Sequence, residues 1–136
     1  MRNVKPNSHN NCIACGESNF NPNSLQLQFA SVCENSVMTK IKLDESYQGY
    51  PNVLHGGVIS TLLDAAMTHC LFARHLEAMT AELTVRFIKP VPINQELIVV
   101  GTCVAEQRGM YKLTSFISLD DNILARAKAK FLLIKA

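Results

Sequence analysis

The sequence lacks tryptophan, a strong net charge and any long hydrophobic run. Phe and Tyr together make up only 7% of its 136 residues. The formal net charge of +2 is too small to indicate nucleic-acid binding, and no Lys- and Arg-rich run is interleaved with aromatic residues. No apolar run approaches the ~18 residues of a membrane-spanning helix, and residues 1–10 lack the apolar segment of a signal peptide. We therefore expect a soluble cytoplasmic protein with no nucleic-acid or membrane partner.

The chain does contain enough apolar residues for one core. Hydrophobic residues make up 48% of a length typical of one ordinary domain. We expect a single domain over residues 1–136, with an irregular arm at residues 1–23, where Asn, Ser, Pro and Gly are frequent. Five cysteines are an odd number, and two of them lie in apolar stretches, which favours reduced thiols over a disulfide framework.

Cys12 and Cys15 in this arm have the spacing of half a zinc site and are followed by Gly16. A structural zinc site usually takes four protein ligands. No second Cys-x-x-Cys follows, so His9 and Cys33 would have to supply the other two. A redox pair is another alternative. The spacing alone favours a structural arm with buried thiols, and we expect no metal and no cofactor.

The longest predicted element is a helix over residues 58–73, beginning after Gly56 and Gly57. It contains no Pro or Gly, and good helix formers dominate it. Apolar side chains fall on nearly all of its sides, which is typical of a helix buried in a core. Its polar residues follow steps of three, four and seven and so form one narrow stripe: Ser60, Thr61, Asp64, Thr68 and, beyond the helix, His75.

Asp64 is the only acidic residue in this helix. Burying an unpaired carboxylate costs several kcal/mol or forces its protonation, so Asp64 needs solvent, a donor or a ligand. Helix periodicity alone favours the simpler explanations, namely a stripe that faces solvent or a local donor. A role in binding or catalysis is the alternative.

Six segments alternate between apolar and polar residues and are predicted strands. They cover residues 25–34, 36–43, 80–88, 97–105, 110–119 and 123–134. A loop at residues 44–54 leads to His55. Two strands, one helix and four strands predict an α+β domain in which an antiparallel sheet curls round the single helix.

Residues 50–57 read Tyr-Pro-Asn-Val-Leu-His-Gly-Gly, and residues 62–64 read Leu-Leu-Asp. This pattern resembles the signature of hotdog-fold acyl-CoA thioesterases of the PaaI-like type, in the thioesterase superfamily. The Cys-x-x-Cys-Gly segment resembles the start of many such sequences, and residues 80–87 with 90–92 resemble their strand after the helix. The resemblance implies the hotdog fold and the hydrolysis of acyl-CoA thioesters to free acid and CoA.

The resemblance also implies roles for four residues. The Gly57 amide would bind the oxyanion, and His55 would hold the thioester carbonyl or the loop. Asp64 would be the general base or the nucleophile, and Thr80 would orient the attacking water. Two positions depart from the family pattern: the Asn or Gln that assists catalysis in some relatives is Gly49 here, and the glycine common after the proline is Asn52.

Binding of CoA requires cations for its phosphates. Arg86, Lys89 and Arg108 are candidates, and the residues expected to contact substrate are Asn52, Gly56, Arg86, Lys89 and Arg108. Arg126, Lys128 and Lys130 are also available. For each cation a solvated strand face is the simpler interpretation. His69 and His75 are predicted to be core or helix-end residues rather than ligands.

The spacing along the helix predicts an oligomer. Gly57 and Asp64 are seven residues apart, which corresponds to roughly 10 Å of helix rise, too far to flank one carbonyl. We expect each site to take Gly57 and His55 from one subunit and Asp64 and Thr80 from the other, in a homodimer or a dimer of dimers. The alternatives for function are a non-catalytic acyl-CoA binding module and a hotdog hydratase or dehydratase.

Overall fold

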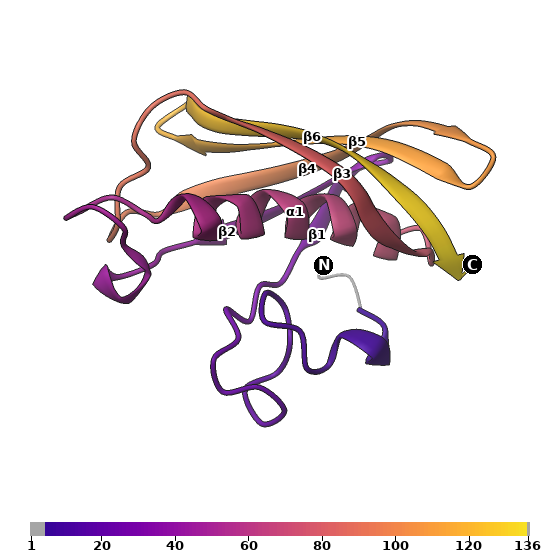
Figure 1. Ribbon diagram of the computed structural model, residues 1–136, viewed down its shortest axis with the longest axis horizontal. Coiled ribbons are helices and arrows are strands. Elements are labelled where there is room, and N and C mark those ends of the chain that lie inside the picture. Colours follow the sequence, from indigo (N-terminus) through magenta and orange to yellow (C-terminus); the bar gives the residue numbers. More distant parts are fainter. Residues whose placement is uncertain (1–4, 136) are drawn as a thin grey trace.

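The computed structural model of the protein describes residues 5–135 (Figure 1). No helix in this range has the length and hydropathy needed to cross a membrane. The main elements are β1 (Ala30–Cys33), β2 (Ser36–Ile41), α1 (Gly56–Phe72), β3 (Glu77–Phe87), β4 (Leu97–Gln107), β5 (Met110–Leu119) and β6 (Asn122–Lys135), with two short 3-10 helices, η1 (Asn7–His9) and η2 (Glu45–Tyr47).

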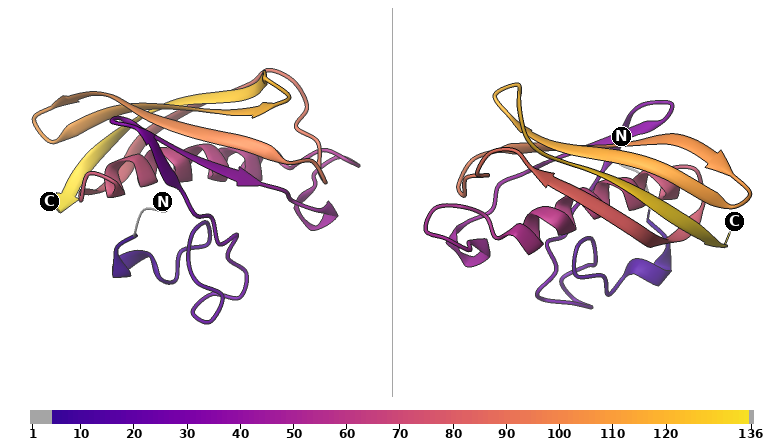
Figure 2. Two further views of the ribbon diagram at one scale, coloured as in Figure 1. Left: turned by 180° about the vertical axis from the view of Figure 1, so that it is seen from behind. Right: turned by 45° about the horizontal axis from the view of Figure 1, so that its top comes forward.

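The six strands form one antiparallel sheet in the order β1-β2-β4-β5-β6-β3. β1 and β3 are its two edges. The sheet curves over one side of α1, as Figures 1 and 2 show. The predicted α+β architecture, a curved antiparallel sheet wrapped around one long helix, is therefore confirmed, and this is the hotdog fold.

α1 lies between the inner face of the sheet and the N-terminal arm (Figures 1 and 2). Ala14 and Cys15 of the arm belong to the same buried cluster as the helix, which explains why α1 is apolar on nearly all sides. On the sheet side, a Cβ on Gly101 would lie 2.4 Å from the Ala66 carbonyl oxygen. The backbones of β4 and α1 therefore touch, and only glycine fits at this position.

The predicted strand over residues 25–34 is wrong in its first half, because β1 begins only at Ala30. Gln26 has a positive φ of 56°, which interrupts the extended conformation. The Leu25 and Leu27 amides instead donate to carbonyl groups of the arm at 2.8 and 3.0 Å. The alternation still identified the buried side chains correctly, since Leu27 and Phe29 are almost completely buried.

The predicted N-terminal arm is irregular from residue 5 to residue 23 apart from η1 and a series of turns. Residues 1–4 of that prediction lie outside the described residues. The expected polar stripe on α1 is confirmed, because Ser60, Thr61, Asp64 and Thr68 are only half-buried between fully buried neighbours.

Candidate active site

The amino end of α1 forms one half of the candidate site. His55 is the N-cap residue, and its Nδ1 accepts a hydrogen bond of 2.8 Å from the Gly57 amide. The amide expected to bind an oxyanion is thus already engaged by a side chain of its own loop. The first N–H groups of a helix have no partner within the helix, and the Gly56 amide has no acceptor anywhere in residues 5–135. The Gly56 amide is therefore the donor that is not already hydrogen-bonded.

The loop before α1 holds His55 in place. Its amide donates to the Tyr47 carbonyl at 3.0 Å, and a Cβ on Gly49 would lie 3.3 Å from the His55 Cα. Gly49 therefore allows the loop to pack closely on the histidine. Asn52 has a φ of 69°, a left-handed conformation that glycine adopts freely and asparagine tolerates better than most residues. The backbone conformation therefore favours glycine or asparagine at position 52.

Asp64 and Thr80 form the other half. Thr80 Oγ1 donates to Asp64 Oδ1 at 2.6 Å. The contact depends on a β-bulge, because Thr80 pairs with Phe131 and the register shifts at Ala81 before Glu82. Side chains alternate between the two faces of a strand. Glu82 lies on the outer face of the sheet, so strict alternation would put Thr80 on the outer face as well. The bulge places Thr80 on the same face as buried Phe131, towards α1.

The Asp64 carboxyl group is half-buried, and this desolvation raises its pKa above the ordinary value. The hydrogen bond from Thr80 and the nearby His9 oppose that rise. Other hydroxyl groups on the polar stripe do not compete, because those of Ser60, Thr61 and Thr68 donate to backbone carbonyls four residues earlier. Thr80 is therefore the only side-chain donor to Asp64 within residues 5–135.

The two halves are separate within one chain. Gly57 lies in the first turn of α1, and Asp64 follows roughly 10 Å further along the helix axis. The chain thus brings His55 to Gly57 and Thr80 to Asp64, but it does not bring the two pairs to one point.

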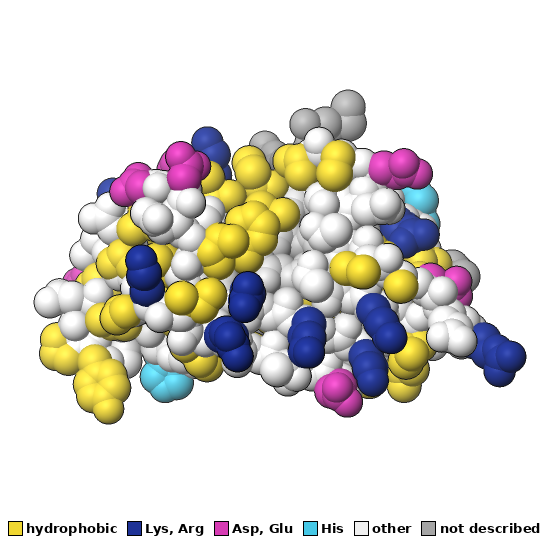
Figure 3. Space-filling model, turned by 90° about the horizontal axis from the view of Figure 1, so that it is seen from above, with side chains coloured by type: hydrophobic (Ala, Val, Ile, Leu, Met, Phe, Trp, Pro, Cys, Tyr) yellow, Lys and Arg dark blue, Asp and Glu magenta, His cyan; other side chains and the backbone are white. Residues whose placement is uncertain are grey.

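The cations expected to contact CoA are dispersed. Arg86, Arg126 and Lys128 line a hollow of about 560 Å³ on the outer face of the sheet, away from α1, where Figure 3 shows a group of cationic side chains. Lys89 follows the end of β3, and Arg108 lies in the β4–β5 turn with a φ of 53°. The three predicted cations therefore do not form one cluster.

Two residues lie beside the site although the sequence does not predict them there. The Phe87 side chain is 54% exposed, and its ring would lie 3.6 Å from a Cβ on Gly56. In the sequence, Phe87 alternates with Leu83, which indicates only a core position. The one local signal is that Phe87 is the last apolar residue on that strand face before the proline segment at residues 90–92. His9 comes from the distant arm, and its charge favours ionised Asp64.

Known proteins resemble this chain over the segment that carries the candidate site. The family model described as Thioesterase superfamily matches residues 51–114, which include His55, Asp64 and Thr80. The acyl-coenzyme A thioesterase THEM4 of Mus musculus is 31% identical over 78 residues, which are 57% of this chain and 34% of that protein. The chain thus spans about a third of the length of this curated relative.

Solved structures share the fold. Zebra fish thioesterase superfamily member 2 superposes with a TM-score of 0.77 at 15% identity, over 96% of this chain and 99% of that one. A hypothetical thioesterase protein with coenzyme A from Streptococcus pneumoniae TIGR4 gives 0.74 at 18% identity, over 80% and 89%. The match of residues 51–114 to the thioesterase superfamily model and the shared architecture agree: the chain has the hotdog fold and is similar in sequence to thioesterases of that superfamily.

Proposed function

We propose that this chain hydrolyses acyl-CoA thioesters to the free acid and CoA. The observation that carries this proposal is the half-buried Asp64 carboxyl group hydrogen-bonded to Thr80 Oγ1 at 2.6 Å, on a helix whose amino end has a free amide. An acid with a raised pKa and a preorganised donor are the two groups that acyl transfer to water needs. The curated relatives are acyl-CoA thioesterases, which supports the choice of substrate class.

In the proposed reaction, water attacks the thioester carbonyl carbon and the Asp64 carboxylate accepts its proton. Thr80 orients the carboxylate and the water. The tetrahedral intermediate then expels the CoA sulfur, which takes up a proton as the carbon–sulfur bond breaks. Direct attack by Asp64, which gives an anhydride that water hydrolyses, is the alternative route through the same residue.

The oxyanion that forms requires donors at the positive end of α1. We propose the amides of Gly56 and Gly57 for this role. The Gly57 amide can serve only if the carbonyl oxygen shares or replaces its hydrogen bond to His55, whereas the Gly56 amide needs no rearrangement. His55 then acts mainly by capping the helix and holding the loop.

The variant Gly56→Pro tests this assignment. Proline is tolerated at the first helical position, and the extended backbone of His55 suits a residue before proline. Loss of the Gly56 amide should lower kcat by ~10²–10³ if it binds the oxyanion. Gly56→Ala keeps the amide and meets only ordinary contacts, so it is the matched control. Full activity of Gly56→Pro would assign the role to the Gly57 amide.

We further propose that the site is completed by a second copy of the chain. The roughly 10 Å between Gly57 and Asp64 requires that the donors of one subunit face Asp64 and Thr80 of another. β3, which carries Thr80, is an edge strand, and an open edge can pair with a further strand. A homodimer or a dimer of dimers meets both requirements.

The phosphates of CoA would contact Arg86, Lys89 and Arg108, as expected from their charge. Arg86 lies on the outer face of the sheet. It can therefore reach only a part of the ligand that extends around the β3 edge. Asn52 is the remaining polar contact proposed near the loop.

The experiment is thiol release from a panel of acyl- and aroyl-CoA esters, comparing the wild type with Asp64→Asn. Asparagine keeps an oxygen that can accept from Thr80, so the variant should fold and assemble normally. We expect hydrolysis by the wild type and a loss of about two orders of magnitude or more in the variant.

Two other outcomes would replace the proposal. If CoA esters raise the melting temperature but no thiol appears, the chain is an acyl-CoA binding module. If the esters are intact and an enoyl ester gains water, it is a hydratase. Equal thiol release by wild type and Asp64→Asn would remove Asp64 from the mechanism.

A further inference from the structure

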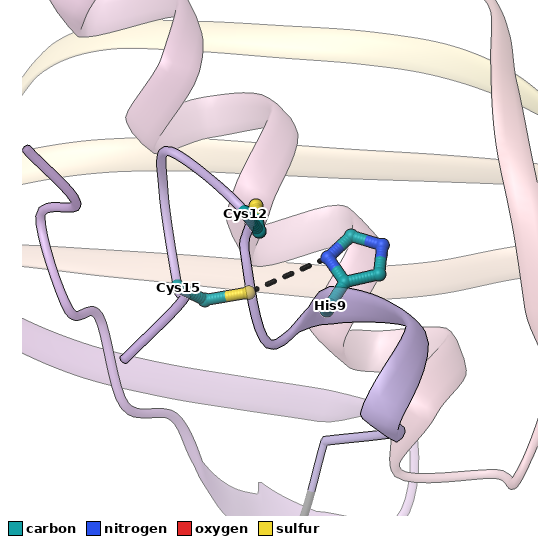
Figure 4. Close-up of side chains that lie close together, drawn as sticks. All are labelled: His9, Cys12 and Cys15. Atoms are coloured by element: carbon teal, nitrogen blue, oxygen red, sulfur yellow. Dashed lines mark hydrogen bonds between the residues drawn. The ribbon is translucent and has the colours of Figure 1, made fainter. Parts of the chain in front are cut away.

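The N-terminal arm brings together three side chains that the proposed hydrolysis does not use. The ligating atoms of His9, Cys12 and Cys15 all lie within 4.8 Å of one another. Figure 4 shows the Cys15 sulfur directed at the His9 ring. Cys15 is buried, and the other two are half-buried. The cluster therefore lies between solvent and the core, against the side of α1 that the sheet does not cover (Figure 1).

The distances suit a tetrahedral zinc ion. With Zn–S of about 2.3 Å and Zn–N of about 2.0 Å, a tetrahedral site separates a sulfur from a nitrogen by roughly 3.6 Å and two sulfurs by roughly 3.8 Å. Cys15 Sγ lies 3.5 Å from His9 Nδ1, and every other pair in the cluster lies within 4.8 Å. Shifts of about 1 Å or less would close the site around the ion.

The loop between the two cysteines is already shaped to present sulfur. The Ala14 amide donates to Cys12 Sγ at 3.3 Å, which fixes the direction of that sulfur. The Gly16 amide donates to the Cys12 carbonyl at 2.7 Å, and a Cβ on Gly16 would lie 2.4 Å from that oxygen. The Cys12 amide in turn donates to the His9 carbonyl at 3.1 Å. One closed turn therefore fixes all three ligands.

We propose that His9, Cys12 and Cys15 bind a zinc ion that fastens the N-terminal arm to α1. Thiolate and imidazole ligands together favour zinc over harder cations. On binding, both thiols release their protons to solvent, and the two thiolates neutralise the charge of the ion. Three protein ligands leave the fourth tetrahedral position to water.

The attachment of the cluster explains what the ion would stabilise. The His9 ring packs edge-on against Phe72, the last residue of α1, with 4.7 Å between the ring centroids. Ala14 and Cys15 belong to the buried core cluster. Since residues 5–23 contain no strand or long helix, a metal link between the turns of the arm would hold this covering layer on the helix.

The test is titration of the untagged full chain with Co²⁺ and Zn²⁺ under reducing conditions, after removal of metal with a chelator. We expect Co²⁺ to give the intense visible bands of a tetrahedral site and thiolate-to-metal charge transfer, both abolished by one equivalent of Zn²⁺. Cys12→Ser and Cys15→Ser should lose these bands. Cys33→Ser, which removes an exposed thiol outside the arm, is the matched control and should keep them.

Stability gives a second readout that does not depend on thioester hydrolysis. Zn²⁺ should raise the melting temperature of the wild type and of Cys33→Ser, but not that of Cys15→Ser. If the Cys variants fail to fold, the wild-type Co²⁺ spectrum still reports the thiolates. A wild-type chain without charge-transfer bands, or equal metal binding by Cys15→Ser, would overturn the proposal.

Discussion

At the scale of single residues, the Asp64–Thr80 pair sets the pH dependence of the proposed reaction. Burial raises the pKa of Asp64, and the hydrogen bond from Thr80 opposes that rise. Because the carboxylate is the active form, the rate should fall as the pH drops through this raised pKa. Thr80→Val removes the donor, so the acidic limb of kcat/KM should move to higher pH. The measurement is a pH–rate profile for CoA ester hydrolysis.

Thr80→Ser is the control, because it keeps a hydroxyl group and should keep the wild-type limb. If the limb of Thr80→Val coincides with that of the wild type, the hydrogen bond does not tune the pKa of Asp64.

Asp64→Asn should be at least as stable as the wild type at neutral pH, since a carboxyl group with a raised pKa destabilises the fold once ionised.

His69 gives a pH dependence of stability. Burial lowers its pKa from 6.5 to about 4, and neither ring nitrogen has a hydrogen-bond partner within residues 5–135. Between pH 6.5 and about pH 4, His69 is protonated in the unfolded chain but neutral in the folded chain. The free energy of unfolding therefore falls as the pH falls through this range. At about 1.4 kcal/mol for each tenfold change in proton affinity, the full loss is about 3 kcal/mol.

We therefore expect His69→Leu, which has a similar volume, to remove this dependence. Urea unfolding at pH 7 and pH 5 should show that the wild type loses about 2 kcal/mol more than the variant. His75→Asn removes an exposed imidazole and should leave the wild-type slope. The same pH slope in His69→Leu would mean that His69 is not buried in its neutral form.

At the scale of elements, the contact between α1 and β4 depends on Gly101. Its Cβ would meet the Ala66 carbonyl oxygen at 2.4 Å, and backbone atoms of a buried helix cannot move aside easily. Gly101→Ala should cost about 1–3 kcal/mol of unfolding free energy or prevent folding. Gly56→Ala, whose Cβ meets only the Phe87 ring at 3.6 Å, should not lose stability. Equal stability of the two variants in denaturant would contradict this view of the packing.

The elements that could be predicted are those with a strong local period. Helical spacing identified α1 and its polar stripe, and turn residues gave β5 at its observed bounds, Met110–Leu119. The bulge at Ala81 could not be predicted, because no residue type there requires it and its cause is the pairing of β3 with β6. The false strand over residues 25–29 arose because correct burial alternation does not reveal the left-handed Gln26.

At the scale of the site, the sequence predicted which residues pair but not how. The resemblance named Gly57 and His55 for the carbonyl and Asp64 and Thr80 for the water. The hydrogen bonds that these residues make could not be predicted, because the spacing of residues in the sequence does not determine the direction of a donor or acceptor. The engagement of the Gly57 amide by His55 is one such direction, and the face of Thr80 is another. The roles themselves stay predictions until the variants are assayed.

At the scale of the whole molecule, the oxyanion donors at the amino end of α1 and Asp64 are roughly 10 Å apart along the helix. If both act on the same carbonyl group, each site requires two chains. Mixing two inactive variants tests this requirement directly. Asp64→Asn lacks only the water-activating half. Gly56→Pro, or Gly57→Pro if the Gly56 amide is not needed, lacks only the oxyanion half.

In a heterodimer of these variants, one site combines both defects and the other combines both intact halves. Equal mixing with free exchange makes half of the dimers heterodimers, so about a quarter of the wild-type activity should return. The measurement is thiol release after subunit exchange, with each variant mixed with itself as the control. Native mass spectrometry verifies that heterodimers form. Heterodimers without activity would place the complete site within one chain and require α1 to act on substrate from a single end.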